Sequence, residues 1–350
     1  VAAVLVVSPT YEGACFDVES IAKICHAAGV PLIVDEAHGA HLAFLEQEKG
    51  RGKFPRAALH CGADLVVQSA HKTLGSLTQS ALLHLGKGAL PQEGVISAAL
   101  AMVQSSSPSY LLLASLDAAR WSLAGGAKDG KRLLEEAVRI VRGVREELSS
   151  MEGIDVIELE GEEGREAGFV GMDPLRLTVS FNGSLGAYEA DDLLEEEFGV
   201  YSELPTANYI TFVFGPGSTF EHGRTLTEAL RQANRKAISR RGTLSPNDGP
   251  SDARASSARS TAPARQLCTP REAFFRPSRF VAAVDAVGLA SAETVCPYPP
   301  GIPALLPGEE ITQEALDLLA TVKDAGSFIS GCTDPSFATI RVVRDTPEFD

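Results

Sequence analysis

Residues 63–73 read ADLVVQSAHKT, and the change of character within this stretch decides the predicted fold. Its first half, Ala63–Gln68, is an apolar run of the length expected for a buried strand. Its second half is polar and includes Lys72, although an unpaired ammonium group beside a buried strand is costly. The stretch therefore predicts a strand that ends at a functional site, with Lys72 desolvated there.

Two further strands with polar ends precede this one. Residues 1–7 read VAAVLVV, a run typical of a strand buried on both faces, and residues 30–34 read VPLIV before Asp35. Between them Asp17 is expected to cap a helix that Gly29 ends. The apolar stripe of this helix comprises Val18, Ile21, Ile24 and Cys25. Alternating strands and helices predict a mostly parallel α/β sheet with right-handed crossovers.

Composition and pattern divide the chain into four parts. Residues 1–126 are expected to form the large α/β domain, and residues 127–233 combine a linking helix with a smaller α+β domain. Residues 234–268 are a basic linker rich in Ser, Pro and Arg, and residues 269–350 form a helical C-terminal domain. The linker is interpreted as solvated and disordered rather than as a docking tract for an acidic partner.

The overall composition excludes several classes of protein. The 350 residues include 31 Lys and Arg against 46 Asp and Glu, and the net charge of −15 argues against non-specific binding to nucleic acid or anionic membranes. No apolar run reaches the roughly 18–20 residues that span a membrane. The six cysteines show no C-x-x-C motif and no zinc-type spacing, so we expect reduced thiols and a cytoplasmic protein.

The polar segments that follow three strands are expected to line one ligand-binding site, called the mouth below, since ligands of a parallel α/β sheet bind beyond the carboxyl ends of its strands. The segments are SPTYEG (8–13), DEAHGAH (35–41) and SAHKTL (69–74). A lysine such as Lys72 can act as a Schiff-base nucleophile, and a carboxylate such as Asp35 can keep the ring nitrogen of pyridoxal phosphate protonated. The alternative is a structural ion pair between these two side chains.

Several stretches of the sequence resemble a single family. Residues 34–41, 64–85 and 107–117, with the proline-rich tail 297–309, resemble the Orn/Lys/Arg decarboxylases, which are fold-type-I enzymes dependent on pyridoxal phosphate. The resemblance implies a large domain similar to that of aspartate aminotransferase, with a mostly parallel sheet. It also implies a smaller α+β domain and a C-terminal decarboxylase domain.

The resemblance gives expected roles to residues around the mouth. Lys72 matches the lysine that binds the cofactor aldehyde, and Asp35 matches the carboxylate at the pyridine nitrogen. His38 matches a position beside the ring hydroxyl and the substrate carboxylate, while Ser69 and His71 match ligands on the phosphate side. Lys72, His38 and Asp35 are therefore the expected catalytic residues. Either Lys72 or His38 is expected to return a proton to the substrate α-carbon.

The reaction implied by the resemblance is decarboxylation of arginine, lysine or ornithine, in that order of preference. Its products are the corresponding amine and CO2, and the amine feeds polyamine synthesis. Glu309 matches a position from which the C-terminal domain can face the basic end of the substrate. A homodimer or a multiple of dimers is also implied, with no nucleic-acid or membrane partner.

The sequence departs from the family pattern in one respect, and several alternative functions stay open. The family's phosphate-binding turn and ring-stacking residue lie upstream of residue 1, and the chain begins without Met inside a strand-like run. We therefore expect an N-terminally truncated piece with weak cofactor retention and little activity, and any organelle-targeting peptide would lie outside it. An aminotransferase or aldolase would instead point Arg176 at Lys72, and a non-catalytic homologue or assembly subunit would do neither reaction. His38 and His41 lack a third ligand, so no metal site is expected.

Overall fold

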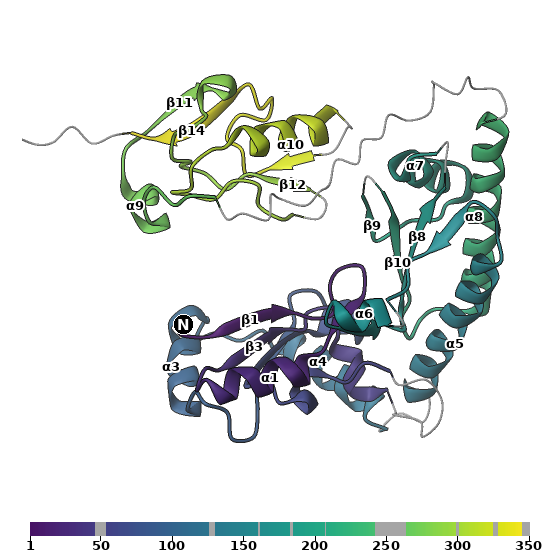
Figure 1. Ribbon diagram of the computed structural model, residues 1–350. Helices are drawn as coiled ribbons and strands as arrows, with labels where there is room; N and C mark the ends of the chain where they lie inside the picture. The colour runs from purple at the N-terminus through teal and green to yellow at the C-terminus, as the bar shows by residue number, and fades with distance from the viewer. Residues whose placement is uncertain are drawn as a thin grey trace, which may run out of the picture. The chain divides into compact units, whose positions relative to one another are not determined.

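Figure 1 shows the computed structural model of the chain. It describes residues 1–45, 54–125, 130–159, 162–182, 185–206, 208–241, 264–298, 301–324 and 328–344. Most of the predicted linker, 234–268, lies outside these ranges. The chain divides into two compact units, one made of residues 1–185, 190–203 and 209–242, and the other made mainly of residues 243–350.

The first unit contains a sheet with the strand order β1-β3-β4-β5. These strands are β1 (Val4–Val7), β3 (Leu32–Asp35), β4 (Leu65–Ser69) and β5 (Ala81–Leu85). β1, β3 and β4 are parallel, and β5 runs antiparallel to β4. The prediction of a mostly parallel sheet is confirmed. Because β3 and β4 are neighbours, Asp35 and the segment after Ser69 lie at the same edge of the sheet.

Helix α1 (Val18–Ala27) packs on one face of this sheet (Figure 1). Asp17 caps it as predicted, since its Oδ1 accepts a hydrogen bond from the Ser20 amide at 3.0 Å. Gly29 follows the helix with φ +66°, a conformation that glycine adopts without strain. Ile24, predicted on the buried stripe, is 71% exposed, because the helix turns a different set of side chains toward the sheet. The core on this face comprises Val18, Ala22, Cys25, Leu32, Val34, Ala58, Ala63 and Val66.

The opposite face of the sheet is open to solvent in the described part of the chain. Val7, Asp35, Val67 and Leu83 pair in register across the four strands, so their side chains form one row on this face. Val7 is 47% exposed, and Leu5 on the same face is 67% exposed. The prediction that the first strand is buried on both faces is therefore wrong, because only the face toward α1 is covered.

The later part of the first unit contains a second sheet. Strands β6 (Ile154–Val156), β8 (Arg176–Phe181) and β10 (Ile210–Val213) form an antiparallel arrangement in the order β6-β8-β10. The long helices α5 (Gly130–Ser149) and α8 (Phe220–Arg241) lie side by side (Figure 1). Helix α8 continues to Arg241, so the beginning of the predicted disordered linker, 234–268, is helical.

The remaining elements of residues 1–241 are short or lie between those already described. Two of them are the helices α4 (Tyr110–Leu123) and α7 (Ala187–Phe198), the second of which is rich in acidic residues. The others are β2 (Ala14–Phe16), η1 (Ala40–Phe44), η2 (Ala58–Cys61), α2 (Ala70–Thr73), α3 (Glu93–Val103), α6 (Glu162–Glu166), β7 (Phe169–Met172) and β9 (Leu204–Pro205).

The second unit combines helices and strands, whereas the sequence predicts helices alone. Its helices are α9 (Pro270–Phe275) and α10 (Gln313–Asp324). The other elements are β11 (Ser278–Ala282), η3 (Ala283–Asp285), β12 (Cys296–Tyr298), β13 (Phe328–Ser330) and β14 (Thr339–Val343). These strands are too short to show a clear alternating pattern, which is why the sequence did not reveal them. Across the described ranges, no helix is long and apolar enough to cross a membrane.

Candidate active site

Lys72 and His38 meet at the predicted mouth. Lys72 lies on the short helix α2, directly after β4, and His38 lies in the loop after β3. The Nζ atom of Lys72 is 3.1 Å from Nε2 of His38. The ring of Tyr11, from the segment after β1, lies with its centroid 4.5 Å from that of His38. The three predicted strand ends therefore do converge, but Lys72 is exposed rather than desolvated as the sequence suggested.

Asp35 and Glu36 are neighbours that serve opposite faces of the sheet. Asp35 ends β3 in the solvent-facing row, and its Oδ1 accepts a hydrogen bond from the Ala37 amide at 3.0 Å. Glu36 is 1% exposed on the face covered by α1. Within the described ranges Asp35 and Lys72 form no ion pair with each other, so the alternative of a structural Lys–Asp pair has no support.

The residues predicted on the phosphate side surround the start of α2. Ser69 is the N-cap of this helix, and its side chain forms no capping hydrogen bond. Nδ1 of His71 is 2.9 Å from the carbonyl oxygen of Ser80 and donates to it, which leaves Nε2 for another partner. The buried hydroxyl of Thr73 has no partner among the described residues, and sequence analysis did not single this residue out.

Arg176 forms hydrogen bonds with two residues of the mouth, His38 and Tyr11. It begins β8, is 1% exposed, and places an Nη2 atom 2.6 Å from Nδ1 of His38. Its Nη1 donates to the carbonyl oxygen of Tyr11 at 3.1 Å. Arg176 therefore contacts His38 and not Lys72, so the arrangement expected for an aminotransferase is not the one found.

The electrostatic surroundings keep His38 uncharged. Burial lowers the pKa of His38 to about 3, and the positive charges of Arg176 and Lys72 act in the same direction. Asp173 acts in the opposite direction but is outweighed. At neutral pH the imidazole is therefore neutral and offers one N–H and one lone pair.

His41 plays a different part from His38. Its Nε2 lies 2.8 Å from Oδ1 of Asp173, and both side chains are fully buried. This pair ties the segment after β3 to the loop between β7 and β8. Within the described ranges no group of three His, Cys, Asp or Glu residues is arranged to hold a metal ion.

Glu36 belongs to a buried network behind the mouth. Its Oε1 accepts from the Ala58 amide at 2.7 Å, and its Oε2 accepts from Nε2 of Gln68 at 2.6 Å. Gln68 in turn lies 2.9 Å from Nε2 of His84 through its Oε1. Burial nevertheless raises the pKa of Glu36 to about 7, because these hydrogen bonds only partly offset the desolvation of the carboxylate.

Replacing Glu36 with glutamine should change the dependence of stability on pH. Between pH 4.5 and about 7 the folded wild type keeps a proton on Glu36 that the unfolded chain releases, so wild-type stability falls as pH rises through this window. Glu36→Gln removes this effect. The free energy of unfolding of the variant relative to wild type should therefore rise by about 3 kcal/mol from pH 4.5 to pH 7.

The measurement is the urea unfolding curve of both proteins at several pH values across this window. The matched control is Glu135→Gln, which changes an exposed glutamate on α5 and should leave the difference from wild type constant. A Glu36→Gln difference that does not grow with pH would contradict the protonated state assigned to Glu36.

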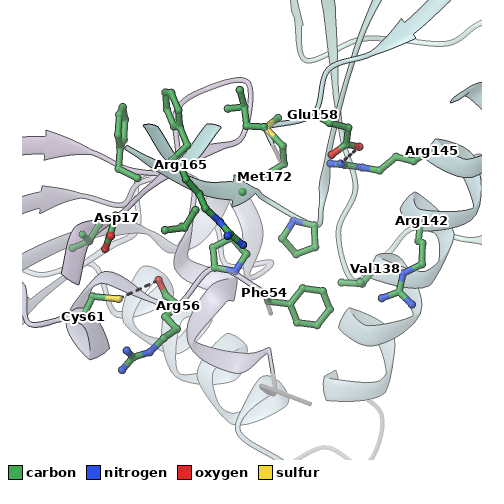
Figure 2. A pocket seen from close by; sticks show the side chains of 18 of the residues that line it. Asp17, Phe54, Arg56, Cys61, Val138, Arg142, Arg145, Glu158, Arg165 and Met172 are labelled. Carbon is green, nitrogen blue, oxygen red and sulfur yellow. Dashed lines mark hydrogen bonds and ion pairs between the residues drawn. The ribbon is translucent and has the colours of Figure 1, made fainter. Parts of the chain in front are cut away.

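A separate cavity of about 1380 Å³ in the first unit does not contain the predicted site residues. Figure 2 shows its lining, in which Arg142 and Arg145 come from α5 and Glu158 turns toward Arg145. Nη1 of Arg145 pairs with Oε1 of Glu158 at 2.6 Å, and Nη1 of Arg56 pairs with Oε2 of Glu19 at 3.0 Å. Its charges are thus partly balanced within the chain, and neither Lys72 nor Asp35 lines it.

Glu309 lies in the second unit. It precedes α10, forms a backbone bridge with Gln266, and accepts a hydrogen bond from the Ser291 amide through its carbonyl oxygen at 2.9 Å. These backbone contacts fix the position of the residue within its unit. Its expected contact with the substrate stays a prediction.

The first unit has the fold of the large domain of a fold-type-I pyridoxal-phosphate-dependent enzyme. Its sheet carries a lysine directly after β4 and a carboxylate at the end of the neighbouring strand β3. Residues 1–222 match the major domain of the Orn/Lys/Arg decarboxylases, and residues 258–333 match the C-terminal domain of the same family. The chain belongs to the Orn/Lys/Arg decarboxylase family. The resemblance inferred from the sequence is confirmed.

Proteins similar in sequence to this chain are named arginine decarboxylase or lysine decarboxylase. The arginine decarboxylase of Bacillus subtilis (strain 168) is 34% identical over 346 residues, which cover 97% of this chain and 66% of that protein. The lysine decarboxylase LdcA of Pseudomonas aeruginosa is 25% identical over 404 residues and is covered to 53% of its length. The chain thus spans just under two thirds of the arginine decarboxylases it matches.

Solved structures show the same fold. The Escherichia coli constitutive lysine decarboxylase superposes with a TM-score of 0.74 at 22% sequence identity, covering 98% of this chain and 58% of that one. Lysine decarboxylase A from Pseudomonas aeruginosa gives a TM-score of 0.72 at 21% identity, over 97% of this chain and 57% of that one. The predicted fold class is thereby confirmed.

Proposed function

We propose that the chain is part of a decarboxylase that acts on a basic amino acid, with arginine as the preferred substrate and pyridoxal phosphate as the cofactor. The contact between Lys72 and His38, at the shared edge of β3 and β4, carries this proposal. Family membership supports it, because Orn/Lys/Arg decarboxylases share this chemistry. The amine product would feed polyamine synthesis.

The side chains around the mouth have the chemistry that pyridoxal phosphate requires. Lys72 offers an exposed amine for the aldehyde, and Asp35 offers a carboxylate for the ring nitrogen. His38 would face the ring hydroxyl. The hydroxyl of Ser69, which forms no capping hydrogen bond, and Nε2 of His71 would bind the phosphate. The unpartnered, buried hydroxyl of Thr73 lies beside Lys72 and adds a polar group that the described chain leaves unsatisfied.

The residues then divide the work of the reaction. When bound, the cofactor supplies an electron sink for the bond between the substrate α-carbon and its carboxylate. Asp35 holds a proton at the ring nitrogen and so keeps that sink effective. Lys72 supplies the amine that holds the cofactor and returns a proton to the α-carbon. Arg176 is engaged by His38 and Tyr11, so its guanidinium does not offer the substrate carboxylate a competing ion pair.

Arginine is favoured as the substrate by the comparisons. The arginine decarboxylase of Bacillus subtilis is 34% identical, whereas the lysine decarboxylase LdcA of Pseudomonas aeruginosa is 25% identical. A guanidinium group is best recognised by a carboxylate that accepts two parallel hydrogen bonds, and Glu309 is our candidate for this role. We further propose a cytoplasmic homodimer or a multiple of dimers as the working assembly.

The test is CO2 release from arginine, lysine and ornithine by the chain supplied with pyridoxal phosphate, with the visible absorbance of the cofactor followed in parallel. We expect arginine to be decarboxylated with the highest kcat/KM. Transfer of the amino group to an added oxo acid without CO2 release would indicate an aminotransferase instead. A chain that forms no adduct even with excess cofactor would fit a non-catalytic homologue, whereas weak retention and slow CO2 release are expected of this chain.

Glu309→Gln should weaken substrate binding more than the chemical step. Loss of the negative charge removes a bidentate partner of the guanidinium, so KM for arginine should rise by about 10- to 100-fold, corresponding to about 1.4–2.7 kcal/mol, with a smaller change in kcat. Steady-state kinetics of CO2 release provide the measurement. Glu310→Gln changes the adjacent carboxylate and is the matched control. Equal effects of the two substitutions would remove Glu309 from the substrate site.

A further inference from the structure

The cavity shown in Figure 2 lies within the first unit and is separate from the mouth. Its lining comes mainly from the antiparallel pair β2 and β7 and from helix α5, and none of the residues predicted to bind the cofactor lines it. Its volume of about 1380 Å³ is larger than the roughly 300–1000 Å³ of a typical ligand site. The cavity therefore has room for an organic molecule away from Lys72.

Aromatic and aliphatic side chains form one part of the lining. Phe16 of β2 and Phe169 of β7 are paired neighbours in the two strands, with ring centroids 4.6 Å apart. Phe54, Val138 and Met172 add further apolar surface. Transfer of an apolar group from water onto such a surface is favourable. This part of the cavity therefore suits a ligand with an aromatic or aliphatic body.

Most of the charged groups that line the cavity already have partners. Arg145 pairs with Glu158 at 2.6 Å, and Arg56 pairs with Glu19 at 3.0 Å. Asp17 accepts the capping hydrogen bond at the start of α1. These five groups are therefore engaged in contacts within the chain.

Arg142 and Arg165 are the exception among the lining arginines. Within the described ranges neither guanidinium forms a hydrogen bond or an ion pair, and both side chains are exposed. Figure 2 shows Arg165 extending into the cavity from the side opposite Arg142. Of the described carboxylates in the lining, only Glu146 is likewise without a partner, so unpaired positive charge is in excess. A guanidinium presents a planar set of N–H donors that fits the oxygens of a carboxylate or a phosphate.

Arg145 holds the basic side of the cavity in place. Its Nη2 donates to the carbonyl oxygen of Asp173 at 3.2 Å and also to the carbonyl oxygen of Arg176. These contacts tie α5 to the turn between β7 and β8, and Arg142 lies three residues before Arg145 on the same side of α5. The helix that presents Arg142 is therefore fixed before a ligand arrives, so binding requires little rearrangement of the backbone.

We propose that this cavity binds an organic anion, with its carboxylate or phosphate bound by the unpaired guanidinium groups of Arg142 and Arg165. The apolar body of the ligand packs against the phenylalanine side chains of the lining. A neutral apolar molecule or an inorganic ion would use only one part of the lining. The inference is independent of the proposed function, because neither Lys72 nor Asp35 takes part in it.

The test is equilibrium dialysis of the full chain against naphthyl phosphate and naphthoate without pyridoxal phosphate, with the bound probe measured by its absorbance. We expect at least one of these anions to bind with a dissociation constant of about 1 mM or lower, and the tighter of the two identifies the acidic group. Naphthol, and inorganic phosphate used as a competitor, should bind at least about 10-fold more weakly. Naphthol or inorganic phosphate binding as tightly as the aromatic anions would overturn the proposal.

A double variant tests the two unpaired arginines. Arg142→Leu combined with Arg165→Leu should weaken binding of the anion by at least about 10-fold, with little change in the urea unfolding curve because both side chains are exposed. The matched control combines Arg120→Leu with Arg139→Leu, which removes two exposed arginines outside the cavity and should leave the affinity unchanged. Equal affinity in the first double variant and in the wild type would refute the site.

A second control locates the bound probe. His71→Ala removes an imidazole from the predicted phosphate side of the mouth and should leave the affinity for the probe unchanged. Loss of binding in His71→Ala, with retention in the double variant of Arg142 and Arg165, would place the anion at the mouth and overturn the proposal. Because the dialysis contains neither substrate nor cofactor, an absence of decarboxylation would leave these results intact.

Discussion

Replacing Lys72 with alanine should abolish the attachment of pyridoxal phosphate to the chain and reduce CO2 release by at least about 10³-fold. The amine of Lys72 is the group at the mouth that can bond to the cofactor aldehyde, and alanine has no nucleophile. After borohydride treatment the wild type should carry the cofactor on the peptide containing Lys72, as detected by mass spectrometry. The visible absorbance of the mixture should change in the wild type and not in the variant.

Two control variants separate the nucleophile from its charge and from lysine in general. Lys72→Arg keeps a positive charge beside His38 but cannot bond to an aldehyde, so it should be as inactive as Lys72→Ala. Lys87→Ala removes an exposed lysine just after β5 and should retain the attachment and the activity. A borohydride-stable cofactor adduct that survives in Lys72→Ala would exclude Lys72 from the site.

Replacing Asp173 with alanine should destabilise the first unit by about 2–5 kcal/mol, because two buried donors lose the carboxylate that accepts their hydrogen bonds. Asp173 and His41 are both fully buried and lie 2.8 Å apart. Burial alone raises the pKa of Asp173, but His41, the Leu175 amide and Arg176 together lower it below its usual value. The variant leaves Nε2 of His41 and the Leu175 amide without their acceptor in a fully buried site.

The measurement is chemical unfolding followed by tryptophan fluorescence, which reports on the first unit through Trp121. Asp117→Ala is the matched control, because Asp117 pairs with Arg120 on the surface, with side chains 71% and 61% exposed. It should cost no more than about 1 kcal/mol. Because the Asp173 carboxylate interacts electrostatically with Arg176, Asp173→Ala should also loosen the contact of Arg176 with His38. Comparable unfolding midpoints for the two variants would show that the buried pair is not a structural tie.

Much of the fold could be predicted from local pattern. The strand after residue 62 and the strand ending at Asp35 are apolar runs followed by polar residues, and such runs report burial directly. The open face of β1 could not be predicted, because an apolar run shows that side chains are suited to burial and not that a covering layer is present. The strands of the second unit could not be predicted for a different reason. Strands of three to five residues carry too few alternations of apolar and polar side chains to distinguish them from loops.

The candidate site was predictable only at the ends of strands. Lys72, Asp35 and His38 follow apolar runs, and the parallel arrangement places such positions together. The contacts from Arg176 to His38 and from Asp173 to His41 join residues more than 130 positions apart, and no spacing rule connects them. Asp35 and Glu36 could not be told apart by pattern alone. The structure separates them because alternate residues of a strand point to opposite faces.

The row formed by Val7, Asp35, Val67 and Leu83 links two equilibria, which are association with a second protein surface and binding of the cofactor. Asp35 shares this row with apolar neighbours, so a second protein surface that buried the row would also strip water from the carboxylate. A lower local dielectric strengthens the attraction between that carboxylate and a protonated ring nitrogen. Association and cofactor affinity would then rise together, each favouring the other by the same factor. Retention of the cofactor would consequently increase with protein concentration.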